Sequence, residues 1–554
     1  MAFSTYRLFL CGVALLPGIA YAQVAGPADV GRVGETPSFL TPAPAAEVAV
    51  PTPAIEMRIP PQADQVALTI TRVDIEGMTA FSRADIDPLL SPYMHRETSL
   101  ESLWLMAAAI TAQYQQAGYF LSRAFVPNQQ IDGGMVQLVV VEGYIGHVAL
   151  DNEIGEHSLV QRVARRIQKQ KPVSTKYLEQ QLLLLNDLPG RNFRTVIEPW
   201  PGGKPGAAML RIIAENAAPE HRIYLNNFGS RYFGPHQMGY EFRGSLLANQ
   251  RTEITALTSV PTRELQYFDI DHAFNFTPSL AAYVTGSVAN AAPGYDLTDN
   301  EIEGRSYAVG VGLRYQAIRQ RQENLQLFGG LDGKNVSVDS FGIPITRDHI
   351  RAVRGGLRYD NVEEDGAAHA FSLTVSQGLG FLGASESGEL LLSRAEADPE
   401  FTKLEFSALR QQVVSEEFLL TGQVMGQLAS DPLYSAEEFG FGGPYAGRGY
   451  DASEITGDHG LGGSVELGYL GIAPMGEVTV RPYVFYDIGK VWNDDGNGSD
   501  DSLSSVGIGS YIRHSNGLGG KIAIAQPLTR NVAAPIYGQN GDNPRLIFEI
   551  SYNF

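Results

Sequence analysis

The sequence contains a single cysteine, Cys11, which lies within an apolar run close to the start of the chain. A chain without other thiols has no disulfide framework, no cysteine nucleophile and no thiolate metal site. Arg7 precedes the apolar run from Leu8 to Ile19, and Ala20-Tyr-Ala follows it, which is the small-x-small pattern that signal peptidase cuts after. These features predict a signal peptide over residues 1–22 and an exported mature protein.

Long apolar runs and a positive charge balance are also missing. After the leader, no stretch approaches the roughly 20 apolar residues that a membrane-spanning helix needs. Lys and Arg number 41 against 61 Asp and Glu, for a formal charge of −20, which argues against a nucleic-acid partner. The acidic balance fits an exported protein that does not bind nucleic acid.

Catalytic motifs are absent as well. The sequence has no GxSxG elbow, HExxH helix or Walker loop, so hydrolase, metalloprotease and nucleotide-driven activities lack their residues. The acidic stretch from Asp494 to Asp501 resembles a calcium loop only loosely, because it lacks a glutamate at the twelfth position, and it is interpreted as an extracellular turn. We therefore expect no enzyme activity, no cofactor and no metal site.

The mature chain begins with a linker. Residues 23–66 are rich in proline and alanine and show no sustained periodicity, which is typical of an extended segment. The part from Asp29 to Leu40 has a faint helical pattern, which leaves open whether a plug helix lies there. Two units of alternating strand-like and helical stretches follow, over residues 67–144 and 145–217.

The first unit is predicted to have two strands and two helices. Leu68 to Gly77 alternates as a strand, and Val136 to Gly143 as a second, buried one. Ser82 is the expected N-cap of a short helix, and Ser99 that of a longer helix running to Ala117.

The second unit repeats the order of the first. Ile145 to Leu150 is strand-like, Ser158 to Lys171 is a basic helix, and Ser174 to Leu188 is a second helix. Strands are expected from Phe193 to Pro199 and from Ala207 to Ala214. The basic helix offers a site for acidic lipid or client, although a solvated helix face is the favoured interpretation.

Residues 218–554 show no convincing helix. Strand-length segments of alternating hydrophobicity recur between Gly, Asn, Asp and Pro, and at roughly 20 residues per strand with its connection about 16 strands fit. Because every backbone polar group in lipid must be paired internally, this pattern predicts a closed transmembrane barrel. The last strand alternates apolar residues with polar ones. These apolar residues are Leu546, Phe548, Ile550, Tyr552 and Phe554. The terminal Phe554 is the expected signal for the barrel assembly machinery.

The strongest motif runs from Gly442 to Asp451 and is followed by Phe485-Tyr-Asp-Ile-Gly. Glycines on both sides of Arg448 permit the tight backbone that a loop folded into a narrow lumen needs. Asp487, on a strand with Gly489 beside it, offers a lumen-facing carboxylate and space for a backbone to approach. An ion pair between Arg448 and Asp487 would pin the loop to the barrel wall. The alternative is a turn arginine and a strand-end aspartate, both solvated.

These motifs resemble those of the two-partner secretion transporters, also called TpsB proteins, over nearly the whole mature chain. The resemblance implies that a loop with the core Arg448, Gly449 and Tyr450 enters the lumen, and that its arginine pairs with the aspartate of a Phe-x-Asp-x-Gly strand. That strand motif is matched by Phe485, Asp487 and Gly489.

The first unit is also similar to the POTRA domain of this family, in the stretches Tyr114 to Pro127 and Val141 to Tyr144. Gly118 ends the preceding helix, and Tyr119 to Val126 is expected to form a strand whose edge accepts an extended client by β-augmentation. The candidate client-binding residues are Tyr119, Leu121 and Arg123. Core packing is the alternative explanation for the first two.

The resemblance implies an outer-membrane transporter with periplasmic N-terminal domains. It would translocate a large exported partner, often a β-helical adhesin, haemolysin or toxin in this family, with outer-membrane lipid and the barrel assembly machinery as further partners. Two alternatives remain open. One is an insertase for outer-membrane proteins, although insertases usually carry more POTRA modules, and the other is a passive porin, which would leave the two N-terminal units without a purpose.

Overall fold

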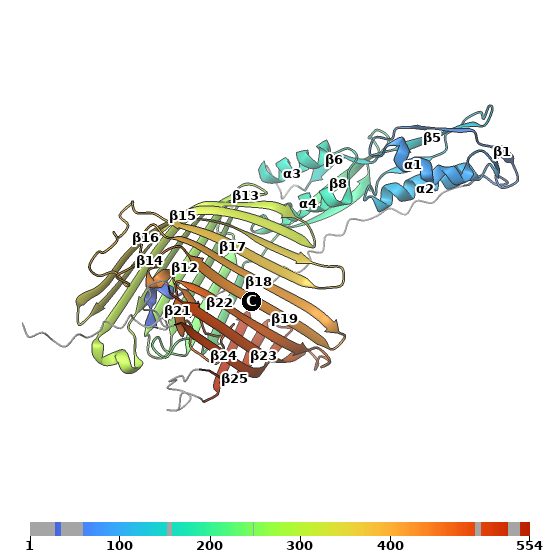
Figure 1. The fold of residues 1–554 in the computed structure, drawn as a ribbon. Coiled ribbons are helices and arrows are strands. Elements are labelled where there is room, and N and C mark those ends of the chain that lie inside the picture. Colours follow the sequence, from blue (N-terminus) through green and yellow to red (C-terminus); the bar gives the residue numbers. More distant parts are fainter. Residues whose placement is uncertain (1–27, 35–58, 152–157, 248, 494–499, 530–542) are drawn as a thin grey trace, which may run out of the picture.

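The computed structural model describes residues 28–34, 59–151, 158–247, 249–493, 500–529 and 543–554. The expected signal peptide, most of the linker and residues 494–499 of the loosely calcium-like stretch lie outside these ranges. Two small α/β units extend from one end of a large β-barrel (Figure 1). The fold is therefore mainly β, as predicted.

The first α/β unit is a three-stranded sheet in the order β2-β5-β4, with two helices packed on it. Its elements are β1 (Ala67–Thr69), β2 (Arg72–Glu76), α1 (Arg83–Leu90), a 3₁₀ turn (Ser91–Tyr93), β3 (Glu97–Ser99), α2 (Ser102–Gln116), β4 (Arg123–Phe125) and β5 (Met135–Val141). Strand β2 runs parallel to β5, and β4 forms the opposite edge of the sheet. The separate pair β1-β3 lies beside this sheet.

Two details of the first unit differ from the prediction. The expected strand from Leu68 to Gly77 is interrupted at Ile70, whose carbonyl accepts a hydrogen bond from the His95 backbone and whose side chain is fully buried. Ser99 is not a helix cap, because it ends strand β3 and pairs with Ala67. The prediction for Ser82 is confirmed, since it precedes α1 and its backbone N–H donates to the Asp85 carboxylate at 2.8 Å.

The carboxylate of Glu142 links three parts of the first unit. Its Oε1 accepts hydrogen bonds from the backbone of Thr79 and Ala80 and from the hydroxyl of Tyr114, each at 2.7 Å. Burial raises the pKa of Glu142, but the hydrogen bonds from Thr79, Tyr114 and Ala80 outweigh it and hold the pKa below the ordinary value of 4.5. The ionised carboxylate therefore stabilises the end of β5 against α2.

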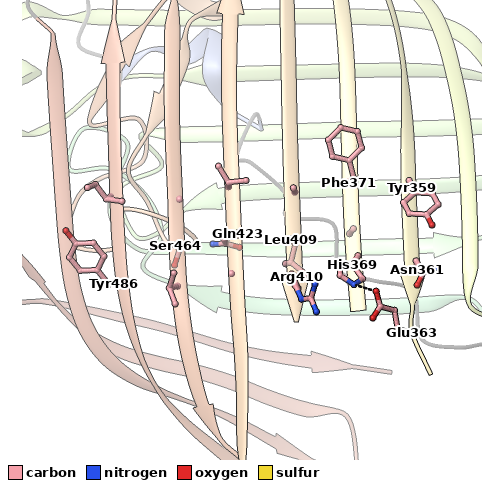
Figure 2. Close-up of a pocket in the computed structure, with 17 residues that line it drawn as sticks. Tyr359, Asn361, Glu363, His369, Phe371, Leu409, Arg410, Gln423, Ser464 and Tyr486 are labelled. Carbon is pink, nitrogen blue, oxygen red and sulfur yellow. Dashed lines mark hydrogen bonds and ion pairs between the residues drawn. The ribbon is translucent and has the colours of Figure 1, made fainter. Parts of the chain in front are cut away.

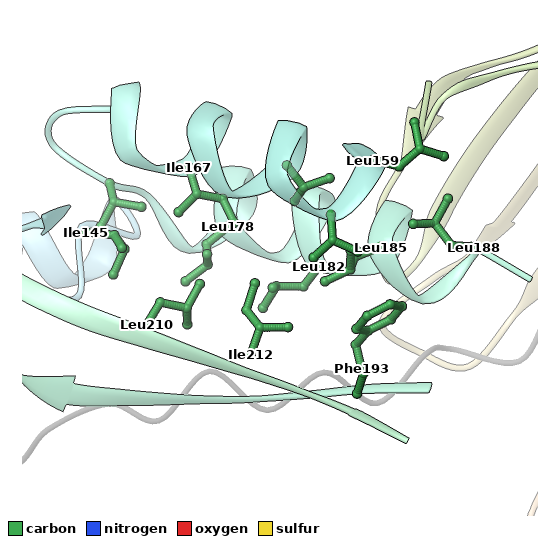
Figure 3. Packing of buried hydrophobic residues seen from close by; sticks show 14 of the residues in the cluster. Ile145, Leu159, Ile167, Leu178, Leu182, Leu185, Leu188, Phe193, Leu210 and Ile212 are labelled. Carbon is green, nitrogen blue, oxygen red and sulfur yellow. The ribbon is translucent and has the colours of Figure 1, made fainter. Parts of the chain in front are cut away.

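The second unit has the helices and strands that the sequence predicts. Its elements are β6 (Tyr144–Leu150), α3 (Ser158–Lys169), α4 (Thr175–Asn186), β7 (Arg191–Pro199) and β8 (Ala207–Asn216). The sheet order is β6-β8-β7. Leucine and isoleucine side chains from both helices fill the space above this sheet (Figure 3). Ser174 caps α4 by accepting the Tyr177 backbone N–H at 3.3 Å.

The two units and the barrel are joined by specific contacts. Phe120, from the first unit, is buried in the hydrophobic core of the second. The Thr175 backbone N–H donates to the Gly118 carbonyl at 2.8 Å. At the barrel, Arg319 forms a bidentate ion pair with Asp187, at 2.7 and 2.9 Å. These contacts hold the second unit against the end of the barrel where β14 turns into β15.

The barrel is closed by 16 antiparallel strands, which confirms the predicted number. They are β9 (Glu220–Asn226), β10 (Gln237–Gly244), β11 (Gln250–Ser259), β12 (Leu265–Thr277), β13 (Leu280–Ala291), β14 (Ile302–Arg319), β15 (Glu323–Ser340), β16 (Ile343–Val362), β17 (Ala368–Gly378), β18 (Thr402–Ser415), β19 (Phe418–Ala429), β22 (His459–Tyr469), β23 (Val478–Trp492), β24 (Asp501–His514), β25 (Leu518–Pro527) and β26 (Arg545–Asn553). A 3₁₀ turn (Tyr295–Asn300) precedes β14.

The barrel closes where β26 pairs with β9. This seam has five residue pairs, from Glu549 with Asn226 to Asn553 with Arg222, whereas β9 and β10 share seven. Along β26, Leu546, Ile550 and Tyr552 are exposed and Arg545, Ile547 and Ser551 are buried, which fits the alternation that the sequence predicts for a wall between lipid and lumen; Asn553, at the end of the strand, is exposed as well. Phe554 follows β26, and its ring stacks on His221.

We expect acid to weaken the first unit. A lowered folded-state pKa at Glu142 gives stability that is present above about pH 4.5 and is lost as the pH falls through the folded-state value. Glu142→Gln should cost about 1–3 kcal/mol at neutral pH and flatten this acid dependence. Because all described α-helices lie in the N-terminal units, far-UV circular dichroism of the full chain reports their unfolding. The exposed Glu76→Gln is the control, and equal stability of the two variants would contradict the prediction.

Candidate functional site

The connection between β19 and β22 folds back into the barrel. It contains a 3₁₀ turn (Ser435–Glu437) and a short antiparallel pair, β20 (Phe439–Phe441) with β21 (Ile455–Gly457). Most of its side chains are buried between residues 433 and 459, including several charged ones. We call residues 430–458 the lumen loop.

Arg448 and Asp487, which the sequence singled out, meet inside the barrel. The guanidinium donates from Nε to Oδ2 at 3.0 Å and from Nη2 to Oδ1 at 2.8 Å, and the Arg448 backbone N–H also reaches Oδ2 at 2.9 Å. Arg448 is 2% exposed and Asp487 is fully buried. The remaining guanidinium donors reach Ser464 Oγ at 2.7 Å and Glu466 Oε2 at 3.0 Å. Every charged atom of the pair is therefore compensated, which a desolvated ion pair requires.

The register of three adjacent strands builds the receptor for Arg448. Asp487 on β23 lies opposite Ser464 on β22 and opposite Ser505 on β24. The Ser505 hydroxyl donates to Asp487 Oδ2 at 3.2 Å and accepts the Gly449 backbone N–H, also at 3.2 Å. Ser464, Asp487 and Ser505 thus form one row across three strands. This row binds the side chain of Arg448 and the backbone of the loop motif.

Aromatic contacts complete this anchor. The ring of Phe485 lies below the guanidinium of Arg448, 3.5 Å from its carbon to the ring centroid, in a cation–π contact. Tyr450 is fully buried, and its hydroxyl donates to the Ser504 carbonyl at 2.8 Å. Phe485 and Tyr450 therefore exclude water from the ion pair.

The glycines of the two motifs serve different purposes. Gly447 has a φ of +76°, which favours glycine, whereas Gly449 lies close to Ser505 and Pro527, so that a Cβ there would be 3.0–3.2 Å from them. A Cβ on Gly489 would lie 2.3 Å from the ring of Phe441. The expectation that Gly489 admits a backbone is therefore wrong, because a buried aromatic side chain of the lumen loop occupies that space.

A second anchor was missed by the sequence analysis. Asp451, directly after the motif, accepts hydrogen bonds from the Arg231 backbone N–H at 3.1 Å and from Arg231 Nε at 2.7 Å. Its other oxygen lies 2.7 Å from Arg545 Nη1, and Arg231 also pairs with Glu454. Arg231 follows β9 and Arg545 begins β26, so Asp451 ties the lumen loop to both strands of the seam. Only the barrel closure brings residues this distant in sequence together.

Two further buried ion pairs hold the start and the end of the lumen loop. Glu437 accepts from Arg354 Nη2 and Lys403 Nζ, both at 2.7 Å. Asp458 pairs with Arg394, whose Nη2 donates at 3.0 Å and which belongs to the connection between β17 and β18. The loop is consequently fixed along its length to the wall and to a neighbouring connection.

Residues 28–34 also lie within the barrel. They form a 3₁₀ turn (Val30–Arg32) in which Val30 packs in a cluster with barrel and loop side chains. Arg32 donates to the carbonyls of Ser435 at 3.0 Å and Glu438 at 2.6 Å. The part of the predicted plug segment that is described is thus a single turn against the lumen loop, and residues 35–40 lie outside the described ranges.

The structure separates the three candidate client-binding residues. Tyr119 packs against the core of the first unit, and Leu121 packs against the core of the second. Arg123 is exposed and begins β4, which is only three residues long because residues 119–121 form a turn rather than the expected strand. Arg123 is therefore the one of the three that is exposed on the edge strand, where the neighbouring Ala124 N–H donates to Thr111 Oγ1 of α2 at 2.9 Å.

The described residues contain neither a helix suited to cross a membrane nor a cluster suited to hold a metal ion. No described helix has the length and hydropathy needed to cross a membrane. Within the same ranges, no three His, Cys, Asp or Glu side chains come together in a way that would hold a metal ion.

Comparison with known proteins places this architecture in a family. The description "Haemolysin secretion/activation protein ShlB/FhaC/HecB" matches residues 280–512, and "POTRA domain, ShlB-type" matches residues 68–143. The heme/hemopexin transporter protein HuxB of Haemophilus influenzae is 23% identical over 458 residues, which cover 80% of each chain. Along the barrel and the first α/β unit, the chain is therefore similar to the two-partner secretion transporters.

Other relatives of this transporter agree. The outer membrane transporter CdiB of Dickeya dadantii is 23% identical over 466 residues, covering 79% of this chain and 78% of its own. The structure of CdiB from Escherichia coli superposes with a TM-score of 0.71 at 18% identity, over 93% of this chain and 94% of that one, which shows a shared fold. This transporter has its barrel in the outer membrane and its POTRA domain, residues 68–143, in the periplasm.

We expect Arg448→Ala to free the lumen loop of this transporter. Removing one partner of a buried pair costs about 3–5 kcal/mol, because Asp487 stays buried without its counter-charge. The sequence has one other thiol, Cys11 in the predicted signal peptide, so a cysteine replacing the buried Ala446 can be followed by maleimide labelling, which should be at least about tenfold faster in Arg448→Ala. Asp487→Ala should act alike, the double variant should add little, and Arg448→Lys should be intermediate because it loses the bidentate geometry. Unchanged labelling in Arg448→Ala would refute this anchor.

We expect Asp451→Ala to weaken the barrel seam. The change leaves Arg231 and Arg545 buried without their shared carboxylate, at a cost of about 3–5 kcal/mol. The folded barrel should lose its compact gel mobility at a lower temperature than the unmodified chain. Asp500→Ala is the matched control, because its pair with Lys490 is exposed and contributes little. Equal melting of both variants would show that Asp451 does not support the seam.

Proposed function

We propose that the protein binds a large exported client in the periplasm and passes it through the barrel to the cell surface, without catalysing a reaction. The observation that supports this most is the combination of two α/β units fixed to the periplasmic end of a barrel and a loop that fills its lumen. We further propose that the two units, 67–144 and 145–217, act together as a POTRA pair, because Phe120 of the first unit is buried in the core of the second.

The described conformation is closed. The lumen loop is held by Arg448 at the wall, by Asp451 at the seam and by Glu437 at Arg354 and Lys403. Residues 28–34 lie against the same loop. A client chain can pass only after some of these contacts exchange for contacts with the client, so we propose that Arg448 and Asp487 are conformational residues that set the closed state.

The edge of β4 is the proposed place of client capture. Arg123 and Phe125 are exposed there, and β5 pairs with one side of β4; on the other side the Ala124 N–H donates to Thr111 Oγ1 at 2.9 Å, a bond that a client strand would replace. An extended client segment would add a strand at this edge and contact Arg123 with an acidic or polar side chain. Tyr119 and Leu121 would support this edge from the two cores rather than bind the client.

The terminal Phe554 is the proposed signal to the barrel assembly machinery. Its ring is 59% exposed and is held at the seam by reciprocal backbone hydrogen bonds with His221, at 3.0 and 3.1 Å. A ring that is both exposed and fixed in place at the periplasmic end of the last strand is available to a partner during insertion.

The insertase and porin alternatives predict different behaviour. An insertase works at its seam and usually carries more POTRA modules than the two α/β units seen here, while a porin needs neither the units nor a lumen filled by a loop. Secretion of the product of the neighbouring gene, compared with assembly of other barrel proteins, separates the three functions.

We expect deletion of residues 68–214 to abolish export of the neighbouring-gene product while the barrel still inserts. The deletion removes both units that would capture the client, whereas Arg448→Ala should reduce export and leave capture intact. The measurement is the client at the cell surface against the client retained in the periplasm, with Asp500→Ala as the control. Export that survives the deletion would contradict the proposal, and poor assembly of other barrel proteins would favour the insertase.

A further inference from the structure

The outer wall of the barrel is hollowed near its periplasmic end. A depression of about 850 Å³ lies over strands β16 to β19, β22 and β23 (Figure 2). This volume is within the range of roughly 300–1,000 Å³ that small-molecule sites occupy. Its floor is formed by outward residues, since Val424, Val465 and Ile488 are all well exposed. We call this depression the wall groove.

Small residues in two adjacent rows of the sheet create the wall groove. In the row nearer the membrane centre, Ala408 and Gly463 lie on either side of Val424, and Phe371 and Ile488 border them. The next row towards the periplasm runs through residues of mixed character. These are Asn361, His369, Arg410, Gly422, Val465 and Tyr486. The wall groove is therefore apolar along its length and polar at one end.

The polar end carries both signs of charge. Arg410 is exposed, donates to Gln412 Oε1 at 2.7 Å, and has no ion-pair partner among the described residues. His369 lies opposite it in the sheet and contacts Glu363 at 2.9 Å. Figure 2 shows Arg410, His369 and Glu363 close together at one end of the wall groove, with Phe371 further along the wall. The turn after β16 continues with two more carboxylates, Glu364 and Asp365.

We propose that the wall groove binds one phospholipid of the periplasmic leaflet with a phosphoethanolamine headgroup. Acyl chains fit the apolar part over Ala408 and Gly463, where burial of each methylene is favourable. The phosphate lies at Arg410, and the ammonium lies towards Glu363. This pairing of opposite charges matches a zwitterionic headgroup, whereas the acidic turn repels a lipid with net negative charge.

Two outward glycines provide the test. A Cβ added to Gly422 meets no atom within 4 Å, so Gly422→Leu fills the wall groove without a clash. Gly286 on β13 also faces outward, opposite the exposed Val309, and a Cβ there makes an ordinary 3.6 Å contact with Ile270. Gly286→Leu is therefore the matched control outside the wall groove. Arg410→Gln tests the headgroup contact without changing the apolar part.

The experiment is native mass spectrometry of the full chain in detergent, with added phosphatidylethanolamine or phosphatidylglycerol. We expect one retained phosphatidylethanolamine, bound about tenfold more weakly in Gly422→Leu and about fivefold more weakly in Arg410→Gln, and unchanged in Gly286→Leu. Equal retention in Gly422→Leu and Gly286→Leu would overturn the site. Phosphatidylglycerol binding as tightly as phosphatidylethanolamine would overturn the headgroup assignment. If Gly422→Leu fails to fold, the Arg410→Gln result decides.

Discussion

The position of the lumen loop in this transporter depends on one buried ion pair, Arg448 with Asp487. An arginine in a loop and an aspartate on a strand are both taken out of water, and only complete hydrogen bonding makes that arrangement stable. Ser464, Glu466 and Ser505 supply the remaining partners from the two strands that flank Asp487, β22 and β24. The pair therefore selects one loop position, because any other leaves a buried charge without its partner.

The lumen loop connects this anchor to the rest of the barrel. Asp451 comes three residues after Arg448 and reaches both strands of the seam, where the shortest pairing between barrel neighbours is found. A displacement of the lumen loop would therefore break contacts at the wall, at the seam and at the turn of residues 28–34 that lies against it. In the proposed function, contacts with the client would replace these ion pairs one after another. The lumen loop could then open without a nucleotide.

In the proposed function, the two α/β units determine the side of the barrel from which the client enters. Phe120 of the first unit is buried in the core of the second, and Arg319 with Asp187 fixes the second unit to the end of the barrel. In the proposed function, a client captured at the edge of β4 would thus be held on the periplasmic side by units fixed to the barrel rather than by a free tether. On the membrane side, the wall groove adds a lipid contact to strands β22 and β23, which also carry the receptor for Arg448.

Much of the architecture follows from local patterns in the sequence. Period-two alternation predicts the barrel strands, including the outward-facing residues of the last strand before Phe554. Helical patterns, with Ser82 and Ser174 as caps, predict the helices of the two units. The glycines around Arg448 indicated a folded-in loop, and the family resemblance supplied its pairing with Asp487. Tertiary structure alone decided the Asp451 anchor, the ring of Phe441 against Gly489, the burial of Tyr119 and Leu121 in different cores, and the wall groove. The Asp451 anchor and the wall groove depend on barrel closure and strand register, and the other two depend on how a loop and two small domains pack, so each brings together residues that no local pattern relates.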